Sequence, residues 1–170
     1  MAFTFFFRDM SILDLIAEHV VPAVSGFTRV RMWDAGCAMG PEPYSLAIVI
    51  AERMGHFMFR NVRIDATDID EQDQFGRTIA AAIYPEEPLK RIPPDLFAKY
   101  FVPADEPGHY RVVDVVRDRI HFRKQDLLCL EPIGSLYHLI MCKNVLLHFQ
   151  HQPVLSRALY FQCVIYSGQV

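Results

Sequence analysis

The sequence contains no apolar run of the roughly 18 residues that a membrane-spanning helix requires. Its apolar first residues, 1–7, have no basic start and are too few for the core of a signal peptide. Lys and Arg are scattered rather than collected in a basic run, and the formal net charge is only -3. We therefore expect neither membrane insertion nor nucleic-acid binding.

Closely spaced cysteine pairs are also missing. The four cysteines lie far apart and form no C-x-x-C pair, so we expect no metal site and no dense disulfide framework. A reducing cytoplasm fits this pattern best. Apolar residues make up 52% and charged residues 22% of the 170 residues, which is typical of one globular domain with a packed core.

Helical and extended patterns alternate in the first half of the chain. Apolar residues recur at helical spacing over 10–24, and Ser11 and Gly26 are the expected N-cap and stop. The later elements are a strand over 29–36, a helix over 41–54 that begins with prolines, a strand over 61–69 and an alanine-rich helix over 71–83. This order predicts parallel strands in an α/β fold.

The second half begins with 84–107, where six prolines surround a short apolar segment at 96–101. We expect a connector or lid here, able to move on binding. Extended segments follow at 110–116 and 120–128, and a stronger strand at 137–142. We divide the single expected domain into four parts. Residues 1–28 are the N-terminal motif with a helix, 29–83 the cofactor-binding half, 84–118 the connector, and 119–170 the remaining sheet with a C-terminal helix.

In an open parallel sheet, a ligand lies beyond the carboxyl ends of the strands, so the loops after the strands form one rim. The loop after the first strand contains Gly36 and Gly40, which allow close backbone approach and positive φ. Its spacing lacks the G-x-G-x-x-G pattern of dinucleotide sites. Because such turns also close ordinary strand–helix connections, the loop alone does not decide whether a ligand binds.

Two acidic residues on this rim have both a functional and a structural interpretation. Asp68 ends the second strand, where nucleotide-binding folds place an acid on the ribose hydroxyls, but it can also cap the following helix. Glu42 is suited to hold the cationic methionine end of a sulfonium cofactor. However, a carboxylate in the first turn of a helix is also stabilised by the helix dipole.

Four motifs occur in order along the chain and together resemble the CheR-type chemotaxis receptor methyltransferases. They are Thr4-Phe5-Phe6-Phe7-Arg8, Gly40-Pro41-Glu42-Pro43-Tyr44-Ser45, Asp68-Ile69-Asp70 and Cys142-Lys143-Asn144-Val145. The family motifs read Thr-x-Phe-Phe-Arg, Gly-x-Glu-Pro-Tyr-Ser, Asp-Ile-Asp and Cys-Arg-Asn-Val. The resemblance extends to Phe149.

The resemblance implies a Rossmann-like class I methyltransferase fold, a mostly parallel sheet flanked by helices, with S-adenosylmethionine as cofactor and S-adenosylhomocysteine as product. It implies that Glu42 holds the methionine end, Asp68 the ribose, and Asp126 with Leu127 the adenine. Thr4 and Arg8 are expected to close the pocket. The remaining residues of the implied cofactor site are Gly36, Gly40, Lys143 and Asn144.

The implied reaction is the attack of a protein glutamate carboxylate on the sulfonium methyl group. A carboxylate with a pKa near 4.3 is ionised at neutral pH and needs no base. Arg8 is the expected catalytic residue because its guanidinium can orient this carboxylate. A merely structural arginine at a helix start remains the alternative.

The chain departs from the family pattern at three positions. Asp126 replaces an asparagine, and Lys143 replaces an arginine, which keeps the charge and loses the bidentate fork. His148 stands where relatives have a tyrosine at the methyl-transfer site. A catalytic and a structural role for His148 both stay open, and a catalytic role predicts pH-sensitive activity.

Compared with the family, we also expect the N-terminal helical domain and the terminal strands to be missing. A sheet without its terminal strands exposes an unpaired edge, which predicts a homo-oligomer formed through that edge. The leading hypothesis is a methyltransferase acting on a protein, such as a chemoreceptor or another signalling protein. The alternatives are a cofactor-binding regulatory module without transfer activity, and an interaction protein that no longer binds the cofactor.

Overall fold

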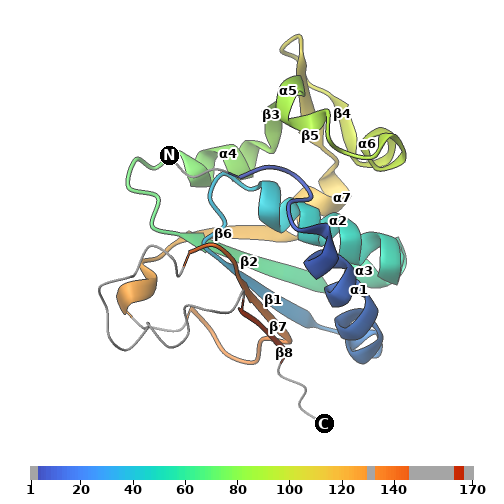
Figure 1. The fold of residues 1–170 in the computed structure, drawn as a ribbon, viewed down its shortest axis with the longest axis vertical. Coiled ribbons are helices and arrows are strands. Elements are labelled where there is room, and N and C mark those ends of the chain that lie inside the picture. Colours follow the sequence, from blue (N-terminus) through green and yellow to red (C-terminus); the bar gives the residue numbers. More distant parts are fainter. Residues whose placement is uncertain (1–3, 130–132, 146–162, 167–170) are drawn as a thin grey trace.

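We describe residues 4–129, 133–145 and 163–166 of a computed structural model of the protein. They form a five-stranded sheet with helices against it, and a smaller three-stranded sheet at one end of the molecule (Figure 1). The first six residues described run across the region between these two sheets before the first helix begins.

The larger sheet has the order β6-β2-β1-β7-β8. The strands β1 (Val30–Ala35), β2 (Val62–Asp68), β6 (Ile120–Lys124) and β7 (Leu139–Cys142) are parallel, which confirms the predicted α/β fold. β2 and β6 lie on one side of β1 and β7 on the other, so the chain order reverses at β1. Such a switch point opens a crevice at the carboxyl ends of the strands.

Two helix predictions match the structure along their full length, namely α1 (Met10–Val24) and α2 (Pro41–Met54). Together with α3 (His56–Phe59) they cover one face of the larger sheet (Figure 1). The expected N-cap of α1 is wrong, whereas the helix ends at Val24 with Ser25 as its C-cap, just before the expected stop at Gly26. Because the chain enters α1 through a turn in which the N–H groups of Ile12 and Leu13 bond to the carbonyl of Asp9, Ser11 already lies in the first turn.

The helix α4 (Phe75–Ala81) is shorter than the predicted 71–83. The carboxylate of Asp70 accepts hydrogen bonds from the N–H groups of Gln74, Phe75 and Gly76, so the preceding residues form a turn instead of the first helical turn. At the other end, Ala82 adopts a left-handed conformation with φ 54° that stops the helix.

The predicted connector folds into the three-stranded antiparallel sheet, with the order β3-β5-β4. Its elements are β3 (Ile83–Pro85), α5 (Glu86–Leu89), α6 (Pro94–Tyr100), β4 (Phe101–Pro103) and β5 (His109–Val112). The two predicted extended segments, 110–116 and 120–128, are longer than the strands β5 and β6 that the structure contains. The first ends in α7 (Asp114–Arg117), and the second turns into the 3-10 helix η1 (Leu127–Cys129).

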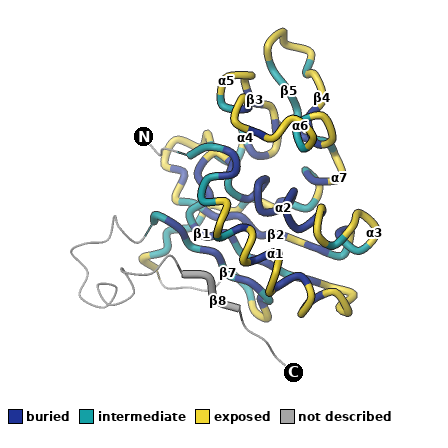
Figure 2. The backbone as a smooth tube through the Cα atoms, turned by 45° about the vertical axis from the view of Figure 1, so that its right-hand side comes forward, coloured by how far each residue is buried: buried dark blue, intermediate teal, exposed yellow. Residues whose placement is uncertain are grey.

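The core is continuous from the N-terminal segment to the larger sheet, and its most buried parts are α2 and the central strands (Figure 2). Phe6 is buried against the smaller sheet, since its ring makes edge contacts with Tyr84 of β3 at 5.0 Å and Phe101 of β4 at 5.3 Å between centroids. Within the described ranges, no helix combines the length and the apolar character needed to span a membrane.

The strand β7 does not form the edge of the larger sheet. β8 (Cys163–Tyr166) pairs with β7 in antiparallel orientation, with Leu139 opposite Tyr166 and Cys142 opposite Cys163. Among the described strands, β8 therefore forms this edge of the sheet, and the homo-oligomer stays a prediction. Most of the predicted C-terminal helix lies outside the described residues.

Candidate functional site

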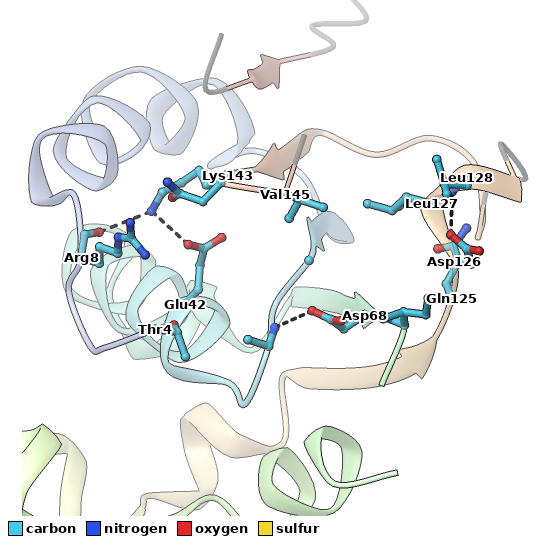
Figure 3. Close-up of a pocket in the computed structure, with 14 residues that line it drawn as sticks. Thr4, Arg8, Glu42, Asp68, Gln125, Asp126, Leu127, Leu128, Lys143 and Val145 are labelled. Atoms are coloured by element: carbon cyan, nitrogen blue, oxygen red, sulfur yellow. Dashed lines mark hydrogen bonds and ion pairs between the residues drawn. The ribbon is translucent and has the colours of Figure 1, made fainter. Parts of the chain in front are cut away.

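A pocket of about 310 Å³ lies at the carboxyl ends of the parallel strands, at the switch point of the sheet (Figure 3). It is lined by nine of the residues predicted from the sequence: Thr4, Arg8, Gly36, Glu42, Asp68, Asp126, Leu127, Lys143 and Asn144. Five further lining residues were not predicted: Ala38, Ile69, Gln125, Leu128 and Val145. The fold thus brings together segments from both halves of the chain.

Gly36 carries the chain from the end of β1 into the pocket wall. Its φ is +91°, and a Cβ atom at this position would lie 1.8 Å from Cγ2 of Val145. Its N–H donates to the carbonyl of Thr67 at 2.7 Å, which fixes the loop against the end of β2. Only glycine fits this combination of positive φ and close side-chain contact.

Gly40, the other predicted glycine, does not line the pocket. It precedes α2 with φ +103°, and a Cβ here would lie 2.5 Å from the hydroxyl of Tyr84 and 2.8 Å from Cγ1 of Ile79. Its absent side chain therefore allows the start of α2 to pack closely against the three-stranded sheet and α4. Gly40 therefore supports the loop between β1 and α2 without contributing to the wall of the pocket.

Asp68 is held at the end of β2 by two backbone donors. Its Oδ2 accepts from the N–H of Ala38 at 2.9 Å, and its Oδ1 from the N–H of Ile69 at 2.8 Å. The helix-capping role that competed for this residue belongs to Asp70 instead. Asp68 lines the pocket, and each carboxylate oxygen retains capacity for a second donor (Figure 3).

Glu42 belongs to a buried cluster of charges. The Nζ of Lys143 lies 3.1 Å from Oε2 of Glu42 and 3.5 Å from Oδ2 of Asp9, and only 1% of the Lys143 side chain is exposed. The Nζ also donates to the carbonyl of Arg8 at 3.4 Å (Figure 3). The ionised Glu42 carboxylate is therefore stabilised by its ion pair with Lys143 as well as by the helix dipole.

The second carboxylate oxygen of Glu42 is differently placed. Its Oε1 is buried and accepts no hydrogen bond from the described donors. Burying a charged oxygen without a donor is unfavourable. An orphaned anionic oxygen beside a pocket is suited to receive a cationic ligand group.

Asp34, on β1, is an acidic residue that the sequence analysis did not assign to the site. It is completely buried, and burial together with the negative charge of Glu42 raises the pKa of its carboxyl well above the usual value. Its signal in the sequence is the alternation Val30, Met32, Asp34, in which an acid takes a core-facing position of the strand.

The opposite end of the pocket is more apolar. Ile69 and Leu128 are large apolar side chains that remain 46% and 42% exposed, and Leu127 lies beside them in η1. The N–H of Leu128 donates to Oδ1 of Asp126 at 2.9 Å, which shapes this turn (Figure 3). Exposed apolar surface beside a polar turn is suited to a flat, partly polar ring.

The N-terminal segment closes the pocket from the side of α2. The N–H of Phe7 donates to Oγ of Ser45 at 2.8 Å, which anchors the segment beside Thr4 and Arg8. The Arg8 side chain is 30% exposed, its Nε lies 3.8 Å from Oδ2 of Asp9, and its guanidinium lies over the Phe5 ring. Arg8 is thus a cationic residue in the wall of the pocket.

His148, the other predicted catalytic residue, lies outside the described residues. Throughout the described part of the chain, no group of three or more His, Cys, Asp or Glu side chains is arranged to hold a metal ion. The charged residues that line the pocket are the acids Glu42, Asp68 and Asp126 and the cations Arg8 and Lys143.

The family model described as "CheR methyltransferase, SAM binding domain" matches residues 2–157. The chain belongs to the CheR methyltransferase family. S-adenosylmethionine (SAM) is the cofactor of this domain. The structure agrees, because the parallel sheet and its switch point place the four CheR-like motifs around one pocket.

Curated relatives are named chemotaxis protein methyltransferases. The chain is 33% identical over 161 residues to "Chemotaxis protein methyltransferase 2" of Pseudomonas aeruginosa, covering 92% of this chain and 55% of that protein. It is 29% identical over 157 residues to "Chemotaxis protein methyltransferase" of Borreliella burgdorferi, covering 88% of this chain and 54% of that protein. The chain thus spans about half the length of the curated relatives that it matches.

Proposed function

We propose that this chain binds SAM in the pocket and transfers the methyl group to glutamate carboxylates of a protein, with chemotaxis receptors as the expected substrates. The observation that carries the proposal is the position of Glu42, Asp68 and Arg8 around one pocket. The names of the relatives support a role in chemotaxis.

The residues of the pocket fit the cofactor from one end to the other. The unpartnered Oε1 of Glu42 suits the ammonium group of the methionine end. Asp68, which retains acceptor capacity, suits the two ribose hydroxyls. At the apolar end, Ile69, Leu127 and Leu128 provide surface for the adenine ring, with Asp126 beside them.

When bound, SAM supplies the electrophilic methyl group of the reaction. The contribution of the chain is to hold the acceptor carboxylate in line with that group and to exclude water. We assign the orienting role to Arg8, because its guanidinium can bond to the carboxylate and leave an oxygen lone pair free. Since glutamate is ionised at neutral pH, the pocket requires no residue to remove a proton.

Transfer of a methyl group to a carboxylate has a distinctive chemical signature. Incubation of the chain with radiolabelled SAM and receptor fragments should label protein, and the label should be released as methanol in alkali because it is an ester. A receptor fragment with its acceptor glutamates changed to glutamine is the matched control. Alkali-stable label would contradict the proposed reaction, and saturable SAM binding without any label would favour the regulatory module.

A further inference from the structure

We propose that Asp34 and Glu42 share one proton in the free protein, and that binding of the cofactor's ammonium group releases this proton to solvent. Asp34 thereby acts as a positioning residue that matches the charge of the site to its ligand. The inference rests on the proposed binding of SAM in the pocket and extends it to a residue that does not line the pocket.

Asp34 is a fully buried acid on β1. Asp34 follows Met32 on the face of β1 that is buried against the helices, and its exposed fraction is 0%. Neither of its oxygens accepts a hydrogen bond from a donor of the described residues. Because an ionised carboxylate can only accept, an ionised Asp34 would be a buried anion without a donor.

The partner of Asp34 is a second carboxyl. Glu42, at the start of α2, also has a buried oxygen without a donor among the described residues, Oε1, and its negative charge acts on the Asp34 carboxyl. A hydrogen bond between two carboxyl groups requires that one of them carries a proton. The pKa of the Asp34 carboxyl is raised well above its usual value, first by burial and next by the negative charge of Glu42, which favours a proton at this position. The pair therefore has one negative charge rather than two.

The surrounding charges agree with that state. Lys143, after β7, faces the pair and balances one negative charge, with its Nζ 3.1 Å from Oε2 of Glu42. Asp68 at the end of β2 adds negative charge, and the buried thiol of Cys37 also lies near. In the N-terminal segment, the Asp9 carboxylate forms a second ion pair with Lys143, and the backbone carbonyl of Arg8 accepts a hydrogen bond from Lys143. Of the two cations at the pocket, Lys143 pairs with Glu42 and the Arg8 guanidinium lies beside Asp9, so one cation balances the charge of the carboxyl pair.

A bound ammonium group changes this balance. It adds one positive charge beside Glu42 and so stabilises the state in which both carboxyls are ionised. The proton of Asp34 then passes to the buffer, and two carboxylates face two cations. By linkage, the affinity for the cofactor rises with pH while the pair is protonated, by at most about tenfold per pH unit for one released proton.

Titration calorimetry in buffers of different ionisation enthalpy counts the protons directly. At pH 6.5, where the α-amino group of the ligand is protonated, S-adenosylhomocysteine should release a fraction of a proton, rising toward about one at lower pH. 5′-Methylthioadenosine has the same adenosine part without the amino-acid end, and it should release none. This comparison uses only the unaltered chain.

Two variants complete the test. Asp34→Asn keeps the shape but cannot ionise, so proton release should disappear and the affinity for S-adenosylhomocysteine should fall by about tenfold, as for a pKa change of one unit. Asp73→Asn removes an exposed acid that pairs with Lys124 and should leave release unchanged. Thermal unfolding checks that both variants are folded.

The outcomes separate this inference from the proposed function. Binding without proton release, equal release with 5′-methylthioadenosine, or full release from Asp34→Asn would each overturn the inference while leaving SAM binding intact. If none of the ligands binds, the proposed function fails and the inference fails with it.

Discussion

The Nζ of Lys143 lies 3.1 Å from Oε2 of Glu42, although about 100 positions separate the two residues in the sequence. Lys143 follows β7 and Glu42 begins α2, so the ion pair joins the late strand to the first strand–helix loop. Because the Lys143 side chain is only 1% exposed, removing either partner would leave the charge of the other poorly compensated in a buried position.

Removing one partner of this pair should be strongly destabilising. Lys143→Met leaves the Glu42 carboxylate buried without its cation, and we expect a loss of about 3–5 kcal/mol in unfolding free energy. The double variant Glu42→Gln with Lys143→Met removes both charges and should recover part of that loss. Denaturant unfolding of the two single variants and the double variant measures the coupling. Additive losses would contradict a direct interaction between the two side chains.

Gly36→Ala should destabilise the protein and prevent cofactor binding. The added Cβ would lie 1.8 Å from Cγ2 of Val145 at a φ of +91°, so steric overlap adds to backbone strain, for an expected loss of about 2–4 kcal/mol. Gly108 is the matched control, because its φ is +75° and a Cβ added there would have nothing within 4 Å. Gly108→Ala should therefore cost only about 1 kcal/mol. Equal losses in thermal or denaturant unfolding would show that the contact with Val145 is unimportant.

Asp70→Ala should weaken the fold without changing the pocket. Asp70 caps the start of α4 by accepting three backbone N–H groups, and its loss should reduce the unfolding free energy by about 1–3 kcal/mol. The affinity for SAM, measured by calorimetry, should stay close to that of the unaltered chain. A large loss of affinity in a folded variant would contradict the division of roles between Asp68 and Asp70.

Asp70 also predicts a pH dependence of stability. Burial alone would raise the pKa of its carboxyl. The hydrogen bonds from the N–H groups of Phe75, Gly76 and Gln74 together lower the pKa by more than burial raises it, so the net shift is downward. A lowered pKa in the folded state gives stability that is present above the unfolded value of about 3.9 and is lost as pH falls through the folded value. Unfolding measured from pH 6 down to pH 3 should show a smaller loss for Asp70→Ala than for the unaltered chain.

Arg8→Ala should reduce methyl transfer more than cofactor binding. If Arg8 orients the acceptor carboxylate, its removal should lower kcat by about 10²–10³-fold, as for the loss of a donor that acts in the transition state. Arg8→Lys keeps the charge without the planar fork and should recover only part of the rate. A change confined to the Kd for SAM would assign Arg8 to cofactor binding alone.

The sequence predicted the parts of the fold in which the local pattern and the tertiary environment agree. The full lengths of α1 and α2 follow from apolar residues at helical spacing and, for α2, from prolines at the start. For the three-stranded sheet, the sequence predicts only a connector, because six prolines surround a short apolar segment over 84–107. Its pairing depends on β5, which lies far along the chain from β3, and no local pattern encodes that pairing.

The residues of the site also differ in how far local sequence patterns predict them. Glu42, Asp68 and Lys143 carry recognisable motifs and stand at strand or helix ends, where a parallel sheet gathers them. Asp34 was not predicted as a site residue because its effect depends on complete burial and on the approach of Glu42 from another element. Asp70 was missed as a cap because its carboxylate reaches four to six residues ahead, beyond the usual capping distance.

The central claim is that the pocket at the end of β2 holds SAM through Asp68, and calorimetric titration of the cofactor tests it most directly. The unaltered chain should bind SAM and S-adenosylhomocysteine saturably with one site. Asp68→Ala should lose that binding while remaining folded, and Asp73→Ala, which removes an exposed acid five residues away, should retain it. Unchanged binding by Asp68→Ala would contradict the assignment of the pocket.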